Sequence, residues 1–444
     1  MTTTPSAAAI DREAFIERFA RTRARSRALF DLLAPEAYYS QPIALRHPIV
    51  FYEGHLAAFN LNTVVKRALG LGGVDPALER LFARGIDPDD ADDAARSGPS
   101  AWPSREEVRG FAEAADRLVL DALGHAVLDR PDHPLLDRAQ AVHAILEHEL
   151  MHQETMLYMW HQLPYESKRR PPTRPMPVDG RPPAPETLEV AAGRATLGAD
   201  LDEVAFAWDN ERPARTVDVA AFRIDRFDVT NEAYLEFVDA GGYRDERWWT
   251  PEAFTWLGAE HVRHPLFWTD REGRWWWRGM FEEVALPPAW PVYVSQSEAA
   301  AYARWKGKRL PTEAEFHRAA YGTPSGIERV QPWGDQAPDT PRGHFDFAGF
   351  DPVPVGGRPA GRSAWGIDDL VGNGWEWTST IFAPFPGFAP LPAYPEYSAD
   401  FFDGQHFVMK GASPATAREL VRRSFRNWFR PQYPYVYATF RCVE

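Results

Sequence analysis

Two histidines stand one helical turn apart in the mostly apolar stretch LEHELMHQETMLYMW, residues 146–160. Residues four apart on a helix project from the same face, so His148 and His152 can both reach one metal ion. Glu154 lies about 200° round an ideal helix from His152. We therefore expect Glu154 to act beside the ligands, fixing a histidine tautomer, rather than to bind the ion itself.

The remaining ligand must come from another helix, and His55 is the best candidate. It lies on the helical stripe Phe51, His55, Phe59, and Gly54 beside it lets a neighbouring backbone approach closely. His47, two turns away at the helix mouth, ranks lower. Three neutral imidazoles suit zinc, iron or copper, and an open site of this kind serves zinc hydrolysis or non-haem iron and oxygen chemistry equally well. Without a metal, the histidines would be ordinary buried core residues.

The elements that must position these histidines are helices. Asp11 is a plausible N-cap for the first, and Ser104 with Glu107 has the spacing of a capping box for the third. Four amphipathic segments joined by modest loops predict a four-helix bundle, whose core is a common place for metals. The segments are residues 11–33, 47–70, 104–123 and 137–163.

The composition and the expected secondary structure differ between the two halves of the chain. Residues 165–187 are rich in proline and charge and predict a linker between a helical domain at 10–164 and a second domain at 188–444. The alternative is one long surface loop. The second domain mixes short β-like pieces with turn-rich segments full of Trp, Gly and Pro. The β-like pieces are residues 216–230, 291–295 and 406–412, and one clear helix is expected at 295–307 with its cap at Ser295 or Ser297.

Composition limits the function further. A chain of 444 residues is too long for one ordinary core. Its formal charge of −14 argues against a nucleic-acid partner. No apolar run is long enough to span a membrane and no secretory signal is visible, so we expect a cytoplasmic protein that acts on small molecules. Cys442 is the only cysteine, which excludes an internal disulfide and a Cys-rich zinc site.

Several motifs resemble known families. The pattern His148-x-x-x-His152-x-Glu154, after a helix bearing His55, resembles the DinB-like four-helix domain. The second half resembles the formylglycine-generating-enzyme fold, a C-type-lectin-like architecture, so the expected fold class is α+β and multidomain. Its motifs are FDVTNEAYLEFV (227–238), PVYVSQSEAAAYARWKGKRLPTEAEF (291–316), PWG (332–334), LVGNGWEWTS (370–379) and RSFRNWF (423–429). In this order, the motifs resemble the ergothioneine-type sulfoxide synthases, which join a sulfur donor to imidazole C2 of hercynine (trimethyl-histidine) using iron(II) and O2.

The resemblance implies roles for individual residues. The Fe(II) ligands would be His55, His148 and His152. A tyrosine upstream of the last strands donates a proton or hydrogen bond near the iron-bound oxygen, and the matching stretch LPAYPEYSADFF offers Tyr394, with Tyr397 as the fallback.

The hercynine pocket of this family is lined by the RNW segment, which points here to Asn427 and Trp428. The quaternary ammonium of hercynine has no N–H to donate, and aromatic faces hold such cations by cation–π attraction of roughly 0.5–2 kcal/mol each. With 17 Trp, 15 Tyr and 27 Phe in the chain, these residues are also explained by ordinary packing.

Two departures from the resemblance bear on the chemistry. Formylglycine-generating enzymes use a pair of cysteines, which a chain with only Cys442 lacks. Members that use γ-glutamylcysteine have Asp and Arg where this chain has Phe429 and Tyr433. Losing both charges removes about 1.5–3 kcal/mol per charged hydrogen bond to a zwitterionic dipeptide, so a different donor is expected.

The segments HPIVFYEGHLAAFNLN and RNWFRPQYPYVYATFR most resemble the selenoneine synthase branch, whose members couple hercynine to a selenosugar. The predicted function is therefore iron(II)- and O2-dependent C–Se bond formation. The first alternative is an ergothioneine sulfoxide synthase that uses a thiol donor, cysteine or γ-glutamylcysteine. A zinc DinB-type hydrolase or thiol transferase, and a lectin-like binding protein with a purely structural helical half, are the others.

Overall fold

The computed structural model describes residues 11–83, 101–172 and 180–444, and its contacts divide the chain into two units. The first comprises residues up to Pro171 together with Pro392–Tyr394, and the second comprises Pro172–Leu391 and Pro395–Glu444. The division at Pro171 falls inside the segment expected to be a linker, of which residues 173–179 lie outside the described part of the chain.

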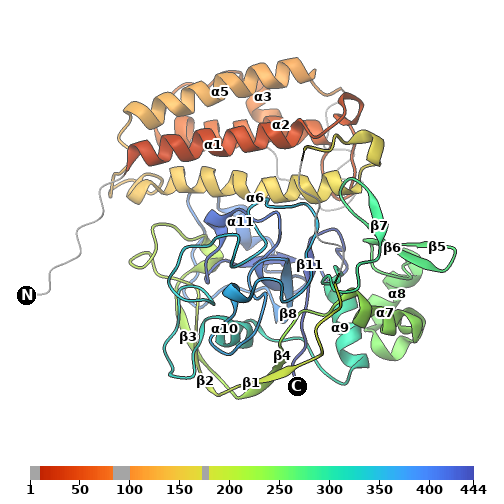
Figure 1. The fold of residues 1–444 in the computed structure, drawn as a ribbon. Coiled ribbons are helices and arrows are strands. Elements are labelled where there is room, and N and C mark those ends of the chain that lie inside the picture. The colour runs from red at the N-terminus through yellow and green to blue at the C-terminus, as the bar shows by residue number, and fades with distance from the viewer. Residues whose placement is uncertain (1–10, 84–100, 173–179) are drawn as a thin grey trace, which may run out of the picture. The chain divides into compact units, whose positions relative to one another are not determined.

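Four long helical segments form the first unit and lie side by side (Figure 1), with α1 against α5 and α6 and α2 against α5 and α6. The helices are α1 Arg12–Phe30, α2 Ile49–Asn60, α3 Pro76–Leu81, α5 Arg105–His125 and α6 Gln140–Gln162, with short turns η1 Pro35–Ala37, η3 Asp137–Ala139 and η4 Tyr165–Ser167. This is the expected four-helix arrangement, with α3 added. Among the described residues, no helix is both long enough and apolar enough to cross a bilayer.

The helix ends follow local rules. The Asp11 side chain accepts from the Ala14 backbone N–H at 3.0 Å. Ser104 and Glu107 form a reciprocal capping box at the start of α5, as expected. The second helix changes character after Asn60, because η2 (Leu61–Ala68) is a π-helical segment that ends near Gly70. Wide helical turns of this kind are frequent at functional sites.

The second unit has little regular structure for its size. A four-stranded sheet runs in the order β10-β9-β8-β11, beside two two-stranded pairs, β1-β4 and β2-β3, and a three-stranded sheet β5-β6-β7. The strands are β1 Thr187–Val190, β2 Gly193–Leu197, β3 Arg215–Val219, β4 Phe222–Asp225, β5 Trp268–Arg271, β6 Arg274–Arg278, β7 Glu283–Ala285, β8 Gly374–Ile381, β9 Phe407–Ala412, β10 Asn427–Phe429 and β11 Ala438–Thr439.

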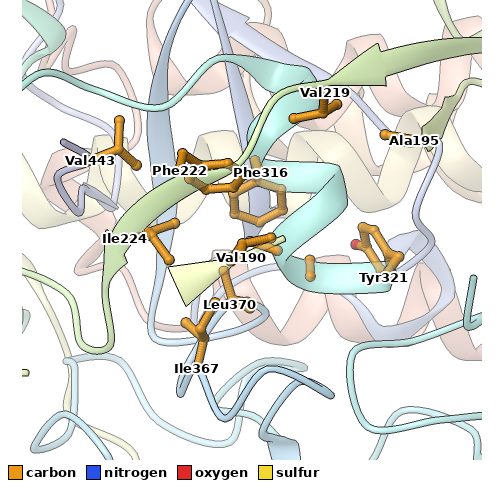
Figure 2. Packing of buried hydrophobic residues seen from close by; sticks show 12 residues of the cluster. Val190, Ala195, Val219, Phe222, Ile224, Phe316, Tyr321, Ile367, Leu370 and Val443 are labelled. Atoms are coloured by element: carbon orange, nitrogen blue, oxygen red, sulfur yellow. The ribbon is translucent and has the colours of Figure 1, made fainter. Parts of the chain in front are cut away.

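More helices form in this unit than the one expected at 295–307. That helix is α9 Gln296–Trp305, capped by Ser295. The others are α7 Asn231–Asp239, α8 Pro251–Ala259, α10 Glu313–Tyr321 and α11 Glu396–Ala399, with short turns η5 Asp209–Glu211, η6 Gly242–Arg244, η7 Glu246–Trp248, η8 Pro359–Gly361 and η9 Arg418–Leu420. Figure 2 shows Phe316 of α10 packed among Val190, Phe222 and Ile224 in the core that α10 shares with β1 and β4.

The β-like piece at 291–295 is not a strand, which corrects the sequence prediction. Val292 donates its backbone N–H to Val229, whereas Val294 donates to Ala438. The two hydrogen bonds go to different segments, so no continuous ladder forms. The pieces at 216–230 and 406–412 do contain strands, namely β4 with most of β3, and β9.

Candidate metal centre

The structure brings three buried histidines of the first unit together. His55 of α2 and His148 and His152 of α6 each offer a ring nitrogen, and these nitrogens lie within 4.8 Å of one another. The Nε2 atoms of His148 and His152 are 3.1 Å apart. Two nitrogens bound at right angles to one ion at about 2.1 Å lie about 3 Å apart, so this spacing suits a shared metal.

Hydrogen bonding leaves one ring nitrogen of His55 available for a metal ion. Its Nδ1 is 2.8 Å from the carbonyl oxygen of Phe82, which must accept the ring N–H because a carbonyl cannot donate. The lone pair is then on Nε2, and no described residue gives this buried atom a hydrogen-bond partner. A buried polar atom without a partner is costly, and a bound metal ion removes that cost. The three residues therefore fit a metal site.

Burial keeps all three rings neutral near neutral pH. It lowers the pKa of His55 to about 4. It also places the pKa of His148 and of His152 well below the ordinary value, and the neighbouring imidazoles lower both further. Neutral imidazole is the form that binds a metal, so protons do not compete for these ligands at physiological pH.

Aromatic rings cover the histidines. Phe59 stacks on His148, with ring centroids 3.6 Å apart and planes 12° apart. Phe51 stacks on His55 at 4.9 Å. These rings come from the stripe that the sequence assigned to one face of α2, and they restrict the orientation of the imidazoles.

Gly54 does permit a close approach, but by a side chain rather than by the backbone that the sequence suggested. A Cβ at Gly54 would lie 2.5 Å from ring atoms of Phe82. The buried Phe82 ring thus sits against α2 while its carbonyl oxygen holds His55. Sequence reasoning missed Phe82 because a backbone carbonyl leaves no signature in residue types.

A second buried network, centred on the residue next to His148, orients α6. The Glu149 carboxylate accepts from Arg23 at 2.9 Å, from Ser26 at 2.6 Å and from Asn60 at 3.0 Å. Arg23 also pairs with Asp116 at 2.8 Å. These contacts join α1, α2, α5 and α6, so the residue that follows His148 anchors the helix that carries both histidines.

Glu154, whose expected role in fixing a histidine tautomer stays a prediction, follows His152 by two residues. It is buried on α6. The Nδ1 atoms of His148 and His152, however, have no hydrogen-bond partner within the described ranges, and Nδ1 of His55 is taken by Phe82.

The two candidate tyrosines differ in their surroundings. Tyr394 belongs to the first unit, and its half-buried ring lies 6.0 Å from His148 and 5.4 Å from Phe59 by ring centroids. Arg67 of η2 donates to the carbonyl oxygens of Pro392 and Ala393, each at 2.9 Å, which anchors the approach to Tyr394.

The fallback residue, Tyr397, belongs to the second unit. Its ring lies 4.1 Å from Trp208 and 5.2 Å from Trp428 by ring centroids. Tyr394 thus belongs to the same unit as the histidines, whereas Tyr397 belongs to the other unit.

The predicted substrate-binding residues lie in and after β10, an edge strand of the second unit. Trp428 is half-buried and stacks on Phe382, with centroids 4.2 Å apart and planes 5° apart. The Asn427 side chain accepts from the Trp428 backbone N–H at 2.9 Å. Phe429 and Tyr433 stack on each other at 5.0 Å and 10°, so the two aromatic replacements form one flat pair.

Comparison with known proteins agrees with this two-part architecture. The model of the DinB superfamily matches residues 18–156, and that of the sulfatase-modifying factor enzyme 1-like domain matches residues 173–444. The chain thus joins a helical domain with a buried histidine trio to a sulfatase-modifying-factor-like domain.

Named relatives match most of the length of this chain. The protein named hercynine oxygenase from Mycolicibacterium thermoresistibile is 37% identical over 381 residues, which cover 84% of this chain and 81% of the relative. The hercynine oxygenase of Mycobacterium tuberculosis is 37% identical over 377 residues, 84% of each chain. Ergothioneine biosynthesis protein 1 of Schizosaccharomyces pombe is 29% identical over 93% of this chain, which spans 54% of that longer protein. This chain belongs to the ergothioneine-type sulfoxide synthase family.

Proposed function

We propose that this protein is an iron(II)- and O2-dependent enzyme that joins a sulfur or selenium donor to imidazole C2 of hercynine. The observation that carries the proposal is the buried trio of neutral imidazoles with an unpartnered Nε2 on His55, in a chain whose relatives are named for the oxygenation of hercynine. A zinc hydrolase uses the same ligands but gives no role to the second unit.

His55, His148 and His152 would hold the iron, which supplies the capacity to activate O2 and to bring it together with the substrates. The protein's own part is to keep these ligands neutral and rigid. Burial holds the rings deprotonated, the Phe82 carbonyl selects the tautomer of His55, and Phe59 restrains His148.

Tyr394 is the proposed proton donor. Its ring lies 6.0 Å from that of His148, and a phenol keeps its proton at neutral pH while it can donate a hydrogen bond. Its chain segment is anchored through two carbonyl oxygens by Arg67. We propose that the Tyr394 hydroxyl protonates or hydrogen-bonds the oxygen species formed in the reaction.

Hercynine is proposed to bind against Trp428. We propose that this half-buried indole holds the trimethylammonium group by a cation–π attraction of about 0.5–2 kcal/mol. Asn427 precedes it on β10 and offers amide groups for a polar part of the same substrate.

The donor has two candidates. The names of the relatives favour a thiol, cysteine or γ-glutamylcysteine, and hence C–S bond formation. The stacked pair Phe429–Tyr433 favours the second candidate, a selenosugar and C–Se bond formation. A flat aromatic surface packs against the apolar face of a sugar ring, whereas it offers no charge to a zwitterionic dipeptide.

The test is reconstitution with iron(II) without oxygen, followed by hercynine, O2 and each donor in turn, with products read by mass spectrometry. We expect an O2-dependent adduct at imidazole C2 with one donor class. A protein that is active with zinc alone and needs no O2 would contradict the proposal and support the hydrolase.

A Phe429→Asp/Tyr433→Arg double variant addresses the donor. If the aromatic pair selects an uncharged donor, we expect this variant to raise the kcat/KM for γ-glutamylcysteine by about tenfold or more, because each charged hydrogen bond contributes about 1.5–3 kcal/mol. The matched control is Tyr435→Arg, which adds one charge just beyond the pair. An unchanged preference in the double variant would leave the donor to be read from the wild-type products alone.

A further inference from the structure

Three buried charged side chains, those of Glu313, Lys410 and Arg426, lie together beside the backbone that precedes Trp428. The Arg426 guanidinium forms a two-pronged pair with Glu313, at 2.9 Å from Nε and 3.1 Å from the terminal nitrogen. Both side chains are almost completely buried, with 2% and 3% of their surfaces exposed. Arg426 also donates to the carbonyl oxygens of Asn210 and Ala383, both at 3.1 Å. Its guanidinium is therefore held by four hydrogen bonds to three residues.

Lys410 of β9 holds the same segment through its backbone. Its ammonium donates to the carbonyl oxygens of Arg423, at 2.9 Å, and Phe425, and lies 4.0 Å from Glu313. Burial lowers the pKa of Lys410 to about 8, while Glu313 opposes that shift. Its neighbour Met409 pairs with Asn427 in the ladder between β9 and β10.

The ion pair reaches Trp428 through a ring. The Arg426 guanidinium lies over Phe382 at 5.0 Å and over Phe385 at 4.3 Å. Phe382 in turn stacks on the indole of Trp428, with planes only 5° apart. The path from Glu313 to Trp428 thus consists of one ion pair, one cation–π contact and one stacked pair.

Burying a lysine, an arginine and one shared carboxylate is not an economical way to stabilise a core, because well-packed apolar residues avoid the desolvation penalty. A saturated ionic network does, however, hold its members in one geometry. We propose that Glu313, Lys410 and Arg426 are positioning residues that set the plane of Trp428 for the quaternary ammonium of hercynine. This inference rests on the proposed function, since it takes hercynine as the ligand of Trp428.

The inference predicts a selective effect. If the network sets the indole plane, its loss weakens hercynine recognition and leaves the metal site and the donor alone. A purely structural role would lower the amount of folded protein without changing the KM of one substrate more than that of the other.

The test compares Glu313→Gln with a matched control, Glu376→Gln. Glu376 is likewise buried and pairs with an arginine, Arg441, at 2.6 and 2.9 Å. We expect Glu313→Gln to raise the KM for hercynine about tenfold, with the KM for the donor and the iron content changed less than twofold. We expect Glu376→Gln to lower thermal stability with no preferential change in the KM for hercynine.

A direct measurement of hercynine binding distinguishes the proposed function from the positioning role of the network. Calorimetric titration of hercynine into the anaerobic iron(II) protein should show binding by the wild type and binding about tenfold weaker by Glu313→Gln. If the wild type does not bind hercynine, the proposed function itself fails. If the wild type binds and Glu313→Gln binds equally well, only the positioning role fails.

A conservative variant distinguishes a loss of positioning from a loss of folding. Arg426→Lys keeps the charge next to Glu313 but loses the fork and the flat cover over Phe382. We expect it to raise the KM for hercynine by about the same factor as Glu313→Gln. A wild-type KM in Arg426→Lys would overturn the path through Phe382.

Discussion

The two units each bury a cluster of polar side chains, and the clusters differ in whether their hydrogen-bonding atoms have partners. In the second unit, every guanidinium nitrogen of Arg441 donates. Its partners are Glu376, Asp228 and the carbonyl oxygens of residues 225, 226 and 368. In the first unit, the histidine trio leaves Nε2 of His55 and Nδ1 of the other two rings without partners among the described residues.

A saturated cluster has a structural explanation, because every guanidinium nitrogen of Arg441 finds an acceptor inside the fold. The one unpartnered oxygen there, Oδ2 of Asp228 in the described chain, belongs to a carboxyl whose pKa burial raises well above its ordinary value. In the histidine trio, the unpartnered Nε2 of His55 has no such internal explanation and calls for a ligand. Comparison of the two thus separates a site built for stability from one built to bind.

The largest effect is expected from removing a ligand of the trio. His148→Ala should lose bound iron and lower turnover by more than about 100-fold, since loss of outer contacts alone costs about 10–100-fold. Iron content and product formation measure this. His143→Ala on the same helix, whose ring lies 5.1 Å from Phe15 by centroids, serves as the control. If His148→Ala kept both iron and turnover, the contrast between the clusters would carry no chemical meaning.

The saturated cluster should respond in stability rather than in metal binding. Arg441→Met leaves the carboxylates of Glu376 and Asp228 buried without their cation, which costs about 3–5 kcal/mol of unfolding free energy. Urea unfolding followed by circular dichroism measures the loss. The folded fraction should still bind iron in the wild-type ratio, and a variant that loses iron but not stability would reverse the assignment.

The carboxyl groups buried near Arg441 predict that the free energy of unfolding depends on pH. Burial raises the pKa of Asp369 to about 6, above the value of about 3.9 in an unfolded chain. The folded state therefore binds this proton more tightly, and the carboxylate costs stability increasingly as pH rises from about 4 to 6. In Asp369→Asn that cost is absent, so its stability relative to wild type should grow by up to about 3 kcal/mol between pH 4 and 7.

Urea midpoints at several pH values test this prediction. Asn suits the position, since residue 369 has a positive φ of 56° that Asn tolerates. A difference between variant and wild type that stays flat with pH would mean that Asp369 is ionised throughout.

The smallest effect on iron binding is expected from Gly54→Ala, a change next to His55 on α2. Gly54→Ala places a methyl group against the Phe82 ring, which should cost about 1–3 kcal/mol by overpacking and shift the carbonyl that holds His55. Iron affinity should fall about tenfold. Gly110→Ala is the control, because its Cβ would meet no atom within 4 Å and should stabilise α5 slightly. Equal iron affinity in both variants would remove Phe82 from the site.

Features of the fold could be predicted from the sequence where they depend on residues a few positions apart. The capping box at Ser104 and the pairing of His148 with His152 on one face follow from spacings of three and four residues along a helix. The short segment 291–295 was misassigned, since its hydrogen bonds go to residues 229 and 438, which no local pattern identifies.

By itself, the sequence determined the helical first half, the turn-rich second half and two histidines that face one way, because periodicity and capping act within a few residues. The sequence also named His55 and Tyr394 as candidates, but only the tertiary structure could bring His55 into the trio, place the Tyr394 ring near His148 and set the Phe82 carbonyl against Nδ1 of His55. These facts depend on which distant backbone and side-chain atoms meet when the core closes, and contacts of that kind leave no periodic trace in the order of residues.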